Sequence, residues 1–314
     1  MGERSVQVGG VLATLLCGIA SGQSAVEGSS GGSPDLAPDN GSASDLLLDT
    51  IDDLDDAWVP GEGLPRWRLR FEPGVAYFSV SGDLEFPGGA VAGSTFDLED
   101  VNLDSPRASF TGELHLAKGK NRITFEGTGF SSSSRESIAL NDARLGPAPI
   151  SAGERVSFSF EYQTFALLGS HRVISRASGV RGDGPPDAAF GVDLIAGLRF
   201  HRVDANASTV AGGEANASAD ELFVEPVFGA GVELTISDAF RIEGRAEGGG
   251  FAFGDQQSIS GNLVVSFEWS PTPHIGLQTG YRLMVLSLES GDDPDRFEWD
   301  GAMAGLFWGV SIAF

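Results

Sequence analysis

Apolar and polar residues alternate one by one through much of residues 66–314, and this period of two most constrains what the chain can fold into. The stretch 240–247 shows it clearly, because every second position is charged: Arg241, Glu243, Arg245 and Glu247. Successive side chains of a β-strand point to opposite faces, so such a stretch has one apolar and one charged face. The sequence therefore predicts a chain built mainly from two-faced strands.

The alternation indicates about ten strands, each close to the roughly 9–11 residues that a tilted strand needs to cross a membrane. Their apolar faces fall in the ranges 67–71, 110–116, 123–125, 156–162, 190–200, 222–236, 240–246, 263–269, 275–285 and 302–314. We expect these faces to point outward, and for the fourth range this means Val156, Phe158, Phe160 and Tyr162.

A soluble sandwich is the main alternative, because its charged faces would meet water while its apolar faces packed together. Trp67, Trp269 and Trp308 lie near strand ends, where they suit the aromatic girdles of a membrane interface. In lipid the backbone polar groups must be satisfied within the chain, so the strands must close. We predict an all-β fold: a closed antiparallel transmembrane β-barrel of about ten strands, within a range of about 8 to 12, after a disordered acidic N-terminal segment.

The residues before the barrel divide into two predicted segments. Residues 1–25 have the positive start, apolar run and small-residue cleavage site of a secretory signal peptide. Residues 26–65 are acidic and rich in Gly, Ser and Pro, which predicts a disordered periplasmic linker. Within it, residues 45–58 predict a short amphipathic helix, either transient in a solvated tail or docked to a partner. Cys17 is the only cysteine, so the mature chain would have no thiol chemistry.

The charge of the chain limits its partners. The formal net charge is -24 and the pI is about 4.3, which argues against nucleic acid and against anionic surfaces. We expect no nucleic acid partner.

The chain ends on a bare aromatic residue, in the sequence F-W-G-V-S-I-A-F. This ending resembles the C-terminal assembly signal of bacterial outer-membrane barrels, carried here by Trp308, Val310, Ile312 and Phe314. With the alternation, residues 66–314 resemble a small Gram-negative outer-membrane barrel of the opacity-protein or porin-like kind. The resemblance implies export to the cell outer membrane, insertion by the barrel-assembly machinery, contact with outer-membrane lipid, and an unknown surface or periplasmic partner.

The charged faces of the predicted strands would line the lumen. This predicted lumen network comprises Arg68, Arg70, Glu72, Glu113, Arg122, Glu126, Glu161, Asp193, Arg199, His201, Glu225, Glu233, Arg241, Glu243, Arg245, Glu247, Glu268 and Arg282. Unpaired charges in a narrow lumen are costly, so we expect them to pair across strands. The network is interpreted either as a structural plug or as a polar permeation path or ligand cavity. We expect Glu233 opposite Arg241, because a register shifted by one residue would set Glu233 against Glu243.

The sequence shows no residue set typical of catalysis. The histidines have no spacing typical of metal ligands, and the outer-loop acids come without a nucleophile and base: Asp204, Asp220, Glu221, Asp292, Asp293 and Asp295. We therefore expect no catalytic, metal-binding or cofactor-binding residues, and a non-enzymatic barrel with a structural or surface-interaction role. A narrow passive channel for small solutes or ions is the first alternative, and an outer-membrane protease or lipid hydrolase is the second.

Overall fold

The computed structural model describes residues 67–88, 95–138, 143–145, 148–178, 187–210, 215–237, 239–292 and 294–314. The predicted signal peptide (1–25), the linker (26–65) and the helix (45–58) lie outside these residues and stay predictions. Among the described residues, no helix has the length and apolar character that a membrane span requires.

The described chain is all-β, as predicted. Its strands are β1 (Arg68–Glu85), β2 (Thr95–Asp97), β3 (Arg107–Lys118), β4 (Asn121–Ile138), β5 (Ala143–Leu145), β6 (Ala148–Ile150), β7 (Arg155–Ser178), β8 (Ala188–Thr209), β9 (Asn216–Ile236), β10 (Phe240–Phe253), β11 (Gln256–Thr272), β12 (Ile275–Ser290) and β13 (Phe297–Ala313).

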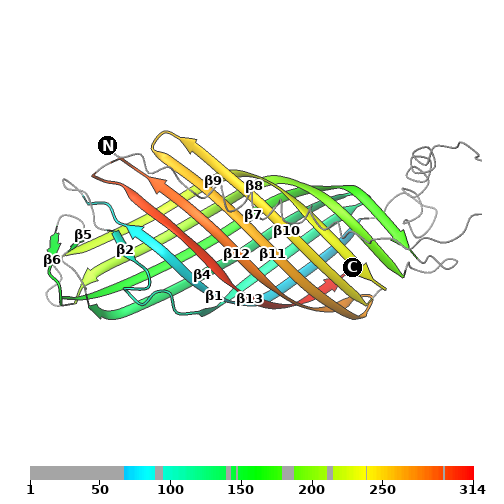
Figure 1. Ribbon diagram of the computed structural model, residues 1–314, viewed down its shortest axis with the longest axis horizontal. Coiled ribbons are helices and arrows are strands. Elements are labelled where there is room, and N and C mark those ends of the chain that lie inside the picture. Colours follow the sequence, from blue (N-terminus) through cyan, green and yellow to red (C-terminus); the bar gives the residue numbers. More distant parts are fainter. Residues whose placement is uncertain are drawn as a thin grey trace, which may run out of the picture. The chain divides into compact units, whose positions relative to one another are not determined.

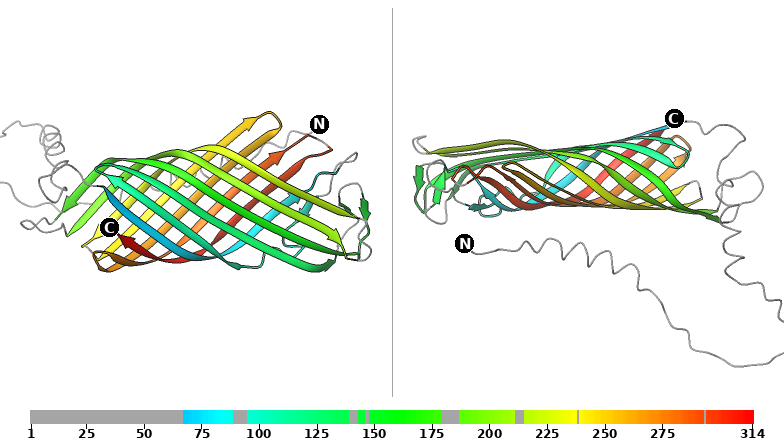
Figure 2. Two further views of the ribbon diagram at one scale, coloured as in Figure 1. Left: turned by 180° about the vertical axis from the view of Figure 1, so that it is seen from behind. Right: turned by 90° about the horizontal axis from the view of Figure 1, so that it is seen from above.

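Ten of these strands form a closed antiparallel ring (Figures 1 and 2). Each pairs with its neighbour in chain order (β1, β3, β4, and then β7 to β13), and β13 returns to pair with β1 from Arg70 opposite Ala313 to Glu85 opposite Glu298. Apart from Trp67 and Phe314 at the two ends, all ten predicted apolar ranges fall on these ten strands, and the prediction of a closed antiparallel barrel is confirmed.

The two ends of the ring differ in their connections. The inner end, defined here as the end with the C-terminus, has tight turns such as Gly119 between β3 and β4. The outer end bears the short hairpin of β5 and β6, and β2, which pairs with the end of β1 (Figure 1). Short connections at one end and long ones at the other are typical of membrane barrels.

The exterior of the ring carries an apolar belt. On β8 every outward residue from Phe190 to Phe200 is apolar, and every outward residue from Arg202 to Ser208 is polar. The apolar run fits the roughly 9–11 residues with which a tilted strand crosses lipid. Other exposed members of the belt are Phe71, Val75, Phe125, Phe165, Leu167, Val224, Phe228, Ile242, Phe267, Leu277, Leu306 and Trp308.

Beyond the belt, the outer half of the ring has a polar exterior and an apolar interior. Glu161 is exposed, whereas Phe158, Phe160 and Tyr162 beside it are at most 3% exposed. The predicted outward direction of Val156 to Tyr162 is therefore wrong, and these side chains point into the ring. The alternation was read correctly, but β7 extends past the belt, and there the apolar face must be buried, as in a soluble protein.

The lumen is consequently filled in two layers. The outer one, called here the aromatic layer, contains Phe78, Phe158, Phe160, Tyr162, Phe297 and Trp299. Trp299 packs edge-on against Phe160 and Tyr162, with ring centroids 4.9 and 5.1 Å apart. The chain after β1 adds Phe86, Leu98 and Leu103 to this layer, so the outer opening is covered by apolar side chains.

The closing pair of strands depends on a small residue in β13, which gives a first prediction. Gly305 lies opposite Phe78, and a Cβ atom there would overlap the carbonyl oxygen of Tyr77. We expect Gly305→Ala to lower the free energy of unfolding by about 1–3 kcal/mol, because the strands must separate to admit the methyl group. The midpoint of urea unfolding, followed by tryptophan fluorescence in detergent, measures the change.

Gly112→Ala on β3 is the matched control, since its Cβ would lie 3.6 Å from the nearest atom, the carbonyl oxygen of Glu72. A loss as large for Gly112→Ala as for Gly305→Ala would contradict the close approach of β13 and β1.

Candidate functional site

The inner half of the lumen is filled by charged side chains from nine strands, and we call this region the ion-pair layer. Its arginines are Arg70, Arg122, Arg172, Arg199, Arg241, Arg245 and Arg282. Its carboxylates are Glu72, Glu113, Glu126, Asp193, Glu225, Glu233, Glu243, Glu247 and Glu268. Two histidines, His115 and His201, lie among them. Each strand places these residues inward because they occupy alternate positions.

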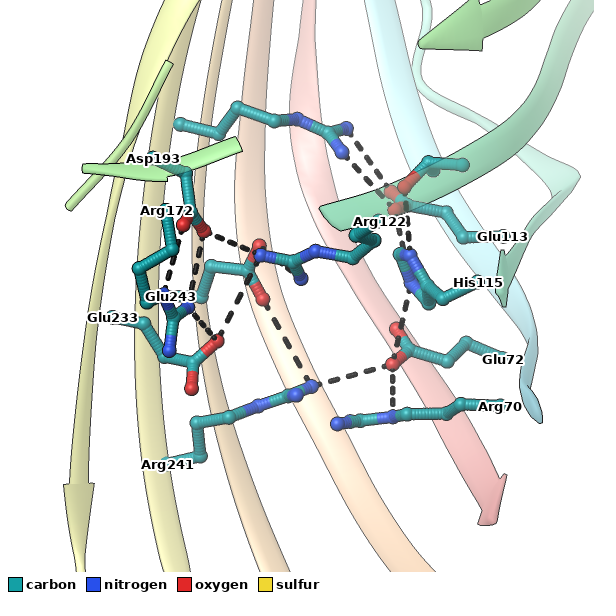
Figure 3. A network of polar contacts seen from close by, with 12 residues as sticks. Arg70, Glu72, Glu113, His115, Arg122, Arg172, Asp193, Glu233, Arg241 and Glu243 are labelled. Carbon is teal, nitrogen blue, oxygen red and sulfur yellow. Dashed lines mark hydrogen bonds and ion pairs between the residues drawn. The ribbon is translucent and has the colours of Figure 1, made fainter. Parts of the chain in front are cut away.

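One group of ion pairs joins β4 and β7 to β8, β9 and β10 (Figure 3). Arg122 on β4 contacts three carboxylates: Asp193 at 2.7 Å, Glu243 at 3.4 Å and Glu233 at 3.8 Å. Arg172 on β7 donates two hydrogen bonds to Asp193, at 2.8 and 3.0 Å, and one to Glu233 at 3.1 Å. Paired guanidinium and carboxylate groups of this kind fix both position and orientation.

This group explains why the predicted register of β9 and β10 is wrong. Glu233 lies directly opposite Glu243, and Arg241 lies opposite Thr235. Facing carboxylates repel in an isolated hairpin. Here Arg122 reaches both from the far wall, so the repulsion that guided the prediction is neutralised by a third strand.

A second group lies toward the inner end. Arg241 contacts Glu268 at 2.8 Å and Glu72 at 3.3 Å, and Arg70 contacts the same two carboxylates, at 2.5 Å in the case of Glu72. Ser270 also donates a hydrogen bond of 3.0 Å to Glu268. The four charges therefore form a closed set that links β1, β10 and β11.

A third group lies closer to the aromatic layer, and all its side chains except Glu113 are at most 7% exposed. Arg245 donates two hydrogen bonds of 3.2 Å to Glu113 and a further one to Glu126. Arg282 on β12 reaches the same two carboxylates at 3.1 Å each. The side chains of Arg199 and its partner Glu247 are both 0% exposed.

A chain of neutral and charged groups forms the boundary between the two layers. His201 Nδ1 lies 2.7 Å from the Tyr162 hydroxyl, and His201 Nε2 lies 3.0 Å from Glu225. Ser260 donates a hydrogen bond to the same carboxylate across Gly249 of β10. A Cβ atom at Gly249 would lie 2.6 Å from Glu225 Oε1, so this glycine lets β9 and β11 side chains meet over β10.

Two small cavities border the ion-pair layer. A cavity of about 10 Å³ lies beside Arg122 and Asp193, and one of about 20 Å³ lies beside Glu72 and Glu113. Each has room for roughly one water molecule. The described side chains thus meet across the lumen instead of lining a wide path.

The structure brings together all but two of the predicted lumen residues. Arg68 is exposed at the inner end, and Glu161 is exposed on the outer face, where it accepts a hydrogen bond from Gln163. Sequence reasoning missed Arg172, because the predicted fourth strand ended before it, although its parity continues that of β7. The parity of His115 predicts its inward direction, which the structure bears out, although the predicted lumen network did not include this residue.

The predicted assembly-signal residues lie on β13 and the C-terminal residue. Trp308, Val310 and Phe314 are exposed on the outer face, and Ile312 is partly buried there. The backbone N–H of Phe314 donates a hydrogen bond of 2.9 Å to Leu69 and thereby extends the closing pair of strands. Their role in assembly stays a prediction.

The comparisons with known proteins concern the fold. The closed antiparallel ring with its apolar belt has the fold of outer-membrane β-barrels. Neither protein-family models nor curated proteins match this chain.

Three similar solved structures are outer-membrane barrels. The outer-membrane protease OmpT from Escherichia coli is 10% identical in sequence, and the match covers 79% of this chain and 97% of that chain with a TM-score of 0.45. The Neisserial surface protein NspA is 12% identical, and the match covers 81% of this chain and 100% of that chain with a TM-score of 0.30. The translocator domain of the autotransporter NalP from Neisseria meningitidis is 13% identical, and the match covers 86% of this chain and 96% of that chain with a TM-score of 0.34.

The ion-pair layer gives a second prediction. Arg122→Met should lower the free energy of unfolding by up to about 3–5 kcal/mol, because three carboxylates lose their shared partner, with lumen water reducing the loss. Combining it with Glu243→Gln should cost less than the sum of the two single changes. Urea unfolding of the four proteins in detergent measures this coupling.

The matched control is Arg202→Met on the polar exterior. Arg202 pairs with Asp220 at 3.2 Å, and both side chains are more than half exposed. Its loss should cost at most about 1 kcal/mol. Equal effects of Arg122→Met and Arg202→Met would contradict a buried network.

A group of carboxylates lies on the polar exterior at the outer ends of β1, β12 and β13. Glu298 is directly opposite both Glu85 and Glu289 on the neighbouring strands. Arg296 contacts Glu298 at 2.9 Å, Glu85 at 3.0 Å and Glu289 at 3.7 Å. Partial burial raises the pKa of Glu298 above its usual value; Arg296 opposes this, and the carboxylate of Asp300 adds to it.

This shift gives a third prediction, on pH dependence. Because the folded state holds the Glu298 proton more tightly than the unfolded chain does, the protein gains stability as the pH falls through the raised pKa. Glu298→Gln should therefore unfold at higher urea than the unchanged protein near about pH 7, and its advantage should shrink toward about pH 4. Glu161→Gln, at an exposed position, is the control. An advantage of Glu298→Gln that grows on acidification would contradict the assignment.

Proposed function

We propose that this protein is a non-enzymatic integral barrel of the outer membrane with a plugged lumen, serving a structural or surface-interaction role. The observation that carries the proposal is that two layers of different chemistry fill the lumen in series. The ion-pair layer fills the inner half, and the aromatic layer fills the outer half.

The two layers exclude solutes for different reasons. An ion entering the aromatic layer would lose its hydration shell among Phe160, Tyr162 and Trp299, which offer it no charge. A solute entering the ion-pair layer would have to break contacts such as the pair of hydrogen bonds between Arg245 and Glu113. Ten strands enclose a narrow interior, which side chains of this size can fill.

The apolar belt supports the location in a membrane. Its aromatic and aliphatic side chains are exposed on all sides of the ring, and water would not favour so large an apolar surface on a soluble protein. The charged face is enclosed, as expected when lipid surrounds the barrel. Co-fractionation with outer-membrane markers tests the location.

The plug gives a fourth prediction, measured as conductance in a planar bilayer. The unchanged protein should show no steady conductance. A variant of the ion-pair layer (Arg245→Ser with Glu126→Ser) and a variant of the aromatic layer (Phe160→Ala with Trp299→Ala) should each stay closed, because the other layer is intact. The variant with all four changes should conduct.

Each variant must first show the difference in gel mobility between unheated and boiled samples that a folded barrel gives. Arg202→Ser with Asp220→Ser, on the exterior, is the control with charges removed outside the lumen. Steady conductance of the unchanged protein would contradict the plug and favour the passive channel.

A further inference from the structure

Three possible metal ligands meet inside the ion-pair layer. Glu72 on β1 lies directly opposite Glu113 on β3, and His115 follows two residues later on the same face of β3. One donor atom from each of these side chains lies within 4.8 Å of the other two. We propose that Glu72, Glu113 and His115 bind one Zn²⁺ ion in the lumen.

The position of the His115 ring is the first argument. Its Nδ1 lies 2.9 Å from Thr124 Oγ1, and its Nε2 lies 3.5 Å from Glu113 Oε2 and 3.6 Å from Glu72 Oε1. These two separations are too long for hydrogen bonds. They suit a shared metal ion, because donors about 2.0–2.1 Å from a tetrahedral Zn²⁺ are about 3.3 Å apart. The His115 side chain is 7% exposed, so its Nε2 is buried and directed at both carboxylates.

The charge of the layer is the second argument. Among the described residues it holds nine carboxylates and seven arginines, which leaves two negative charges in excess when both histidines are neutral. An excess of buried charge is unfavourable where water is scarce. One divalent cation balances this excess.

Neighbouring side chains hold the three proposed ligands in position. Arg70 and Arg241 contact Glu72, and Arg245 and Arg282 contact Glu113, so both carboxylates are held in place by hydrogen-bond donors. In the tautomer that binds a metal through Nε2, His115 Nδ1–H donates a hydrogen bond to Thr124 Oγ1, and such partners are usual behind metal ligands.

The choice of metal follows from the donors. Ca²⁺ and Mg²⁺ prefer shells made of oxygen, whereas imidazole with carboxylates suits Zn²⁺ and its neighbours among the transition metals. The site joins β1 and β3, so bound Zn²⁺ would stabilise the folded barrel by mass action.

The test is a calorimetric titration of the folded full chain in detergent, after treatment with a chelator. With ZnCl₂ we expect one tight site per chain and a rise in the unfolding temperature, and with CaCl₂ or MgCl₂ much weaker binding. His115→Gln and Glu113→Gln should each weaken Zn²⁺ binding at least about 100-fold, since removing a ligand costs more than removing a residue that is hydrogen-bonded to a ligand. In the Co²⁺-loaded chain, the visible spectrum should show tetrahedral coordination.

The matched controls are His171→Gln and Glu161→Gln, whose side chains are exposed. Both should bind Zn²⁺ as the unchanged chain does. Because His115→Gln and Glu113→Gln can also disturb folding, each is compared only if it keeps the gel mobility of the folded barrel. The titration of the unchanged chain decides the matter if neither folds.

Two results would overturn the proposal: no tight Zn²⁺ binding by the unchanged chain, or binding that survives His115→Gln undiminished. Binding is measured in detergent without any bilayer, so it is independent of whether the barrel conducts. If the barrel conducts but binds Zn²⁺, the proposed plug is wrong and the zinc site stands. If the barrel is closed but binds no Zn²⁺, the zinc site is wrong and the plug stands.

Discussion

The structure depends on the pairing of β13 with β1, because it leaves none of the ten strands without two neighbours. In lipid an unpaired backbone group costs several kcal/mol, so an open sheet of this composition could not cross a membrane. Closure in turn encloses one face of every strand. The side chains on that face must then fill a narrow lumen. The ion-pair layer and the aromatic layer are the two ways in which this chain fills it.

The charges on the enclosed face also specify how the strands lie. A slip of one residue in the register would turn a strand over and place charges such as Arg245 and Glu247 in lipid. A strand with two apolar faces would place no charge in lipid when its register slipped, so it could adopt several registers. In the outer half the exterior is polar, so the same specificity comes from the apolar interior around Trp299 and Phe160.

The sequence predicted the ten strands and most of the ion-pair layer, because these follow from parity within single strands. It predicted the closed ring because lipid requires the backbone polar groups to be satisfied within the chain. It did not predict the direction of Phe158 and Phe160, because alternation tells which residues share a face but not which solvent surrounds it. Nor did it predict Glu233 opposite Glu243, which depends on Arg122 from a distant strand. Contacts that depend on three strands at once cannot be predicted from the pattern of neighbouring residues in a sequence.

The same limit applies to the proposed metal ligands. Glu113 and His115 are two residues apart on one strand, but the third donor, Glu72, comes beside them only through the register of β1 and β3. The contacts of this layer are shared, since Glu113 meets two arginines and Arg122 meets three carboxylates, so its stability belongs to the set and not to single pairs. A shared set of ion pairs tolerates facing carboxylates, but its positive and negative charges must still balance over the whole layer. Its total charge, and not any one ion pair, is therefore the quantity through which a bound cation would act on the ion-pair layer.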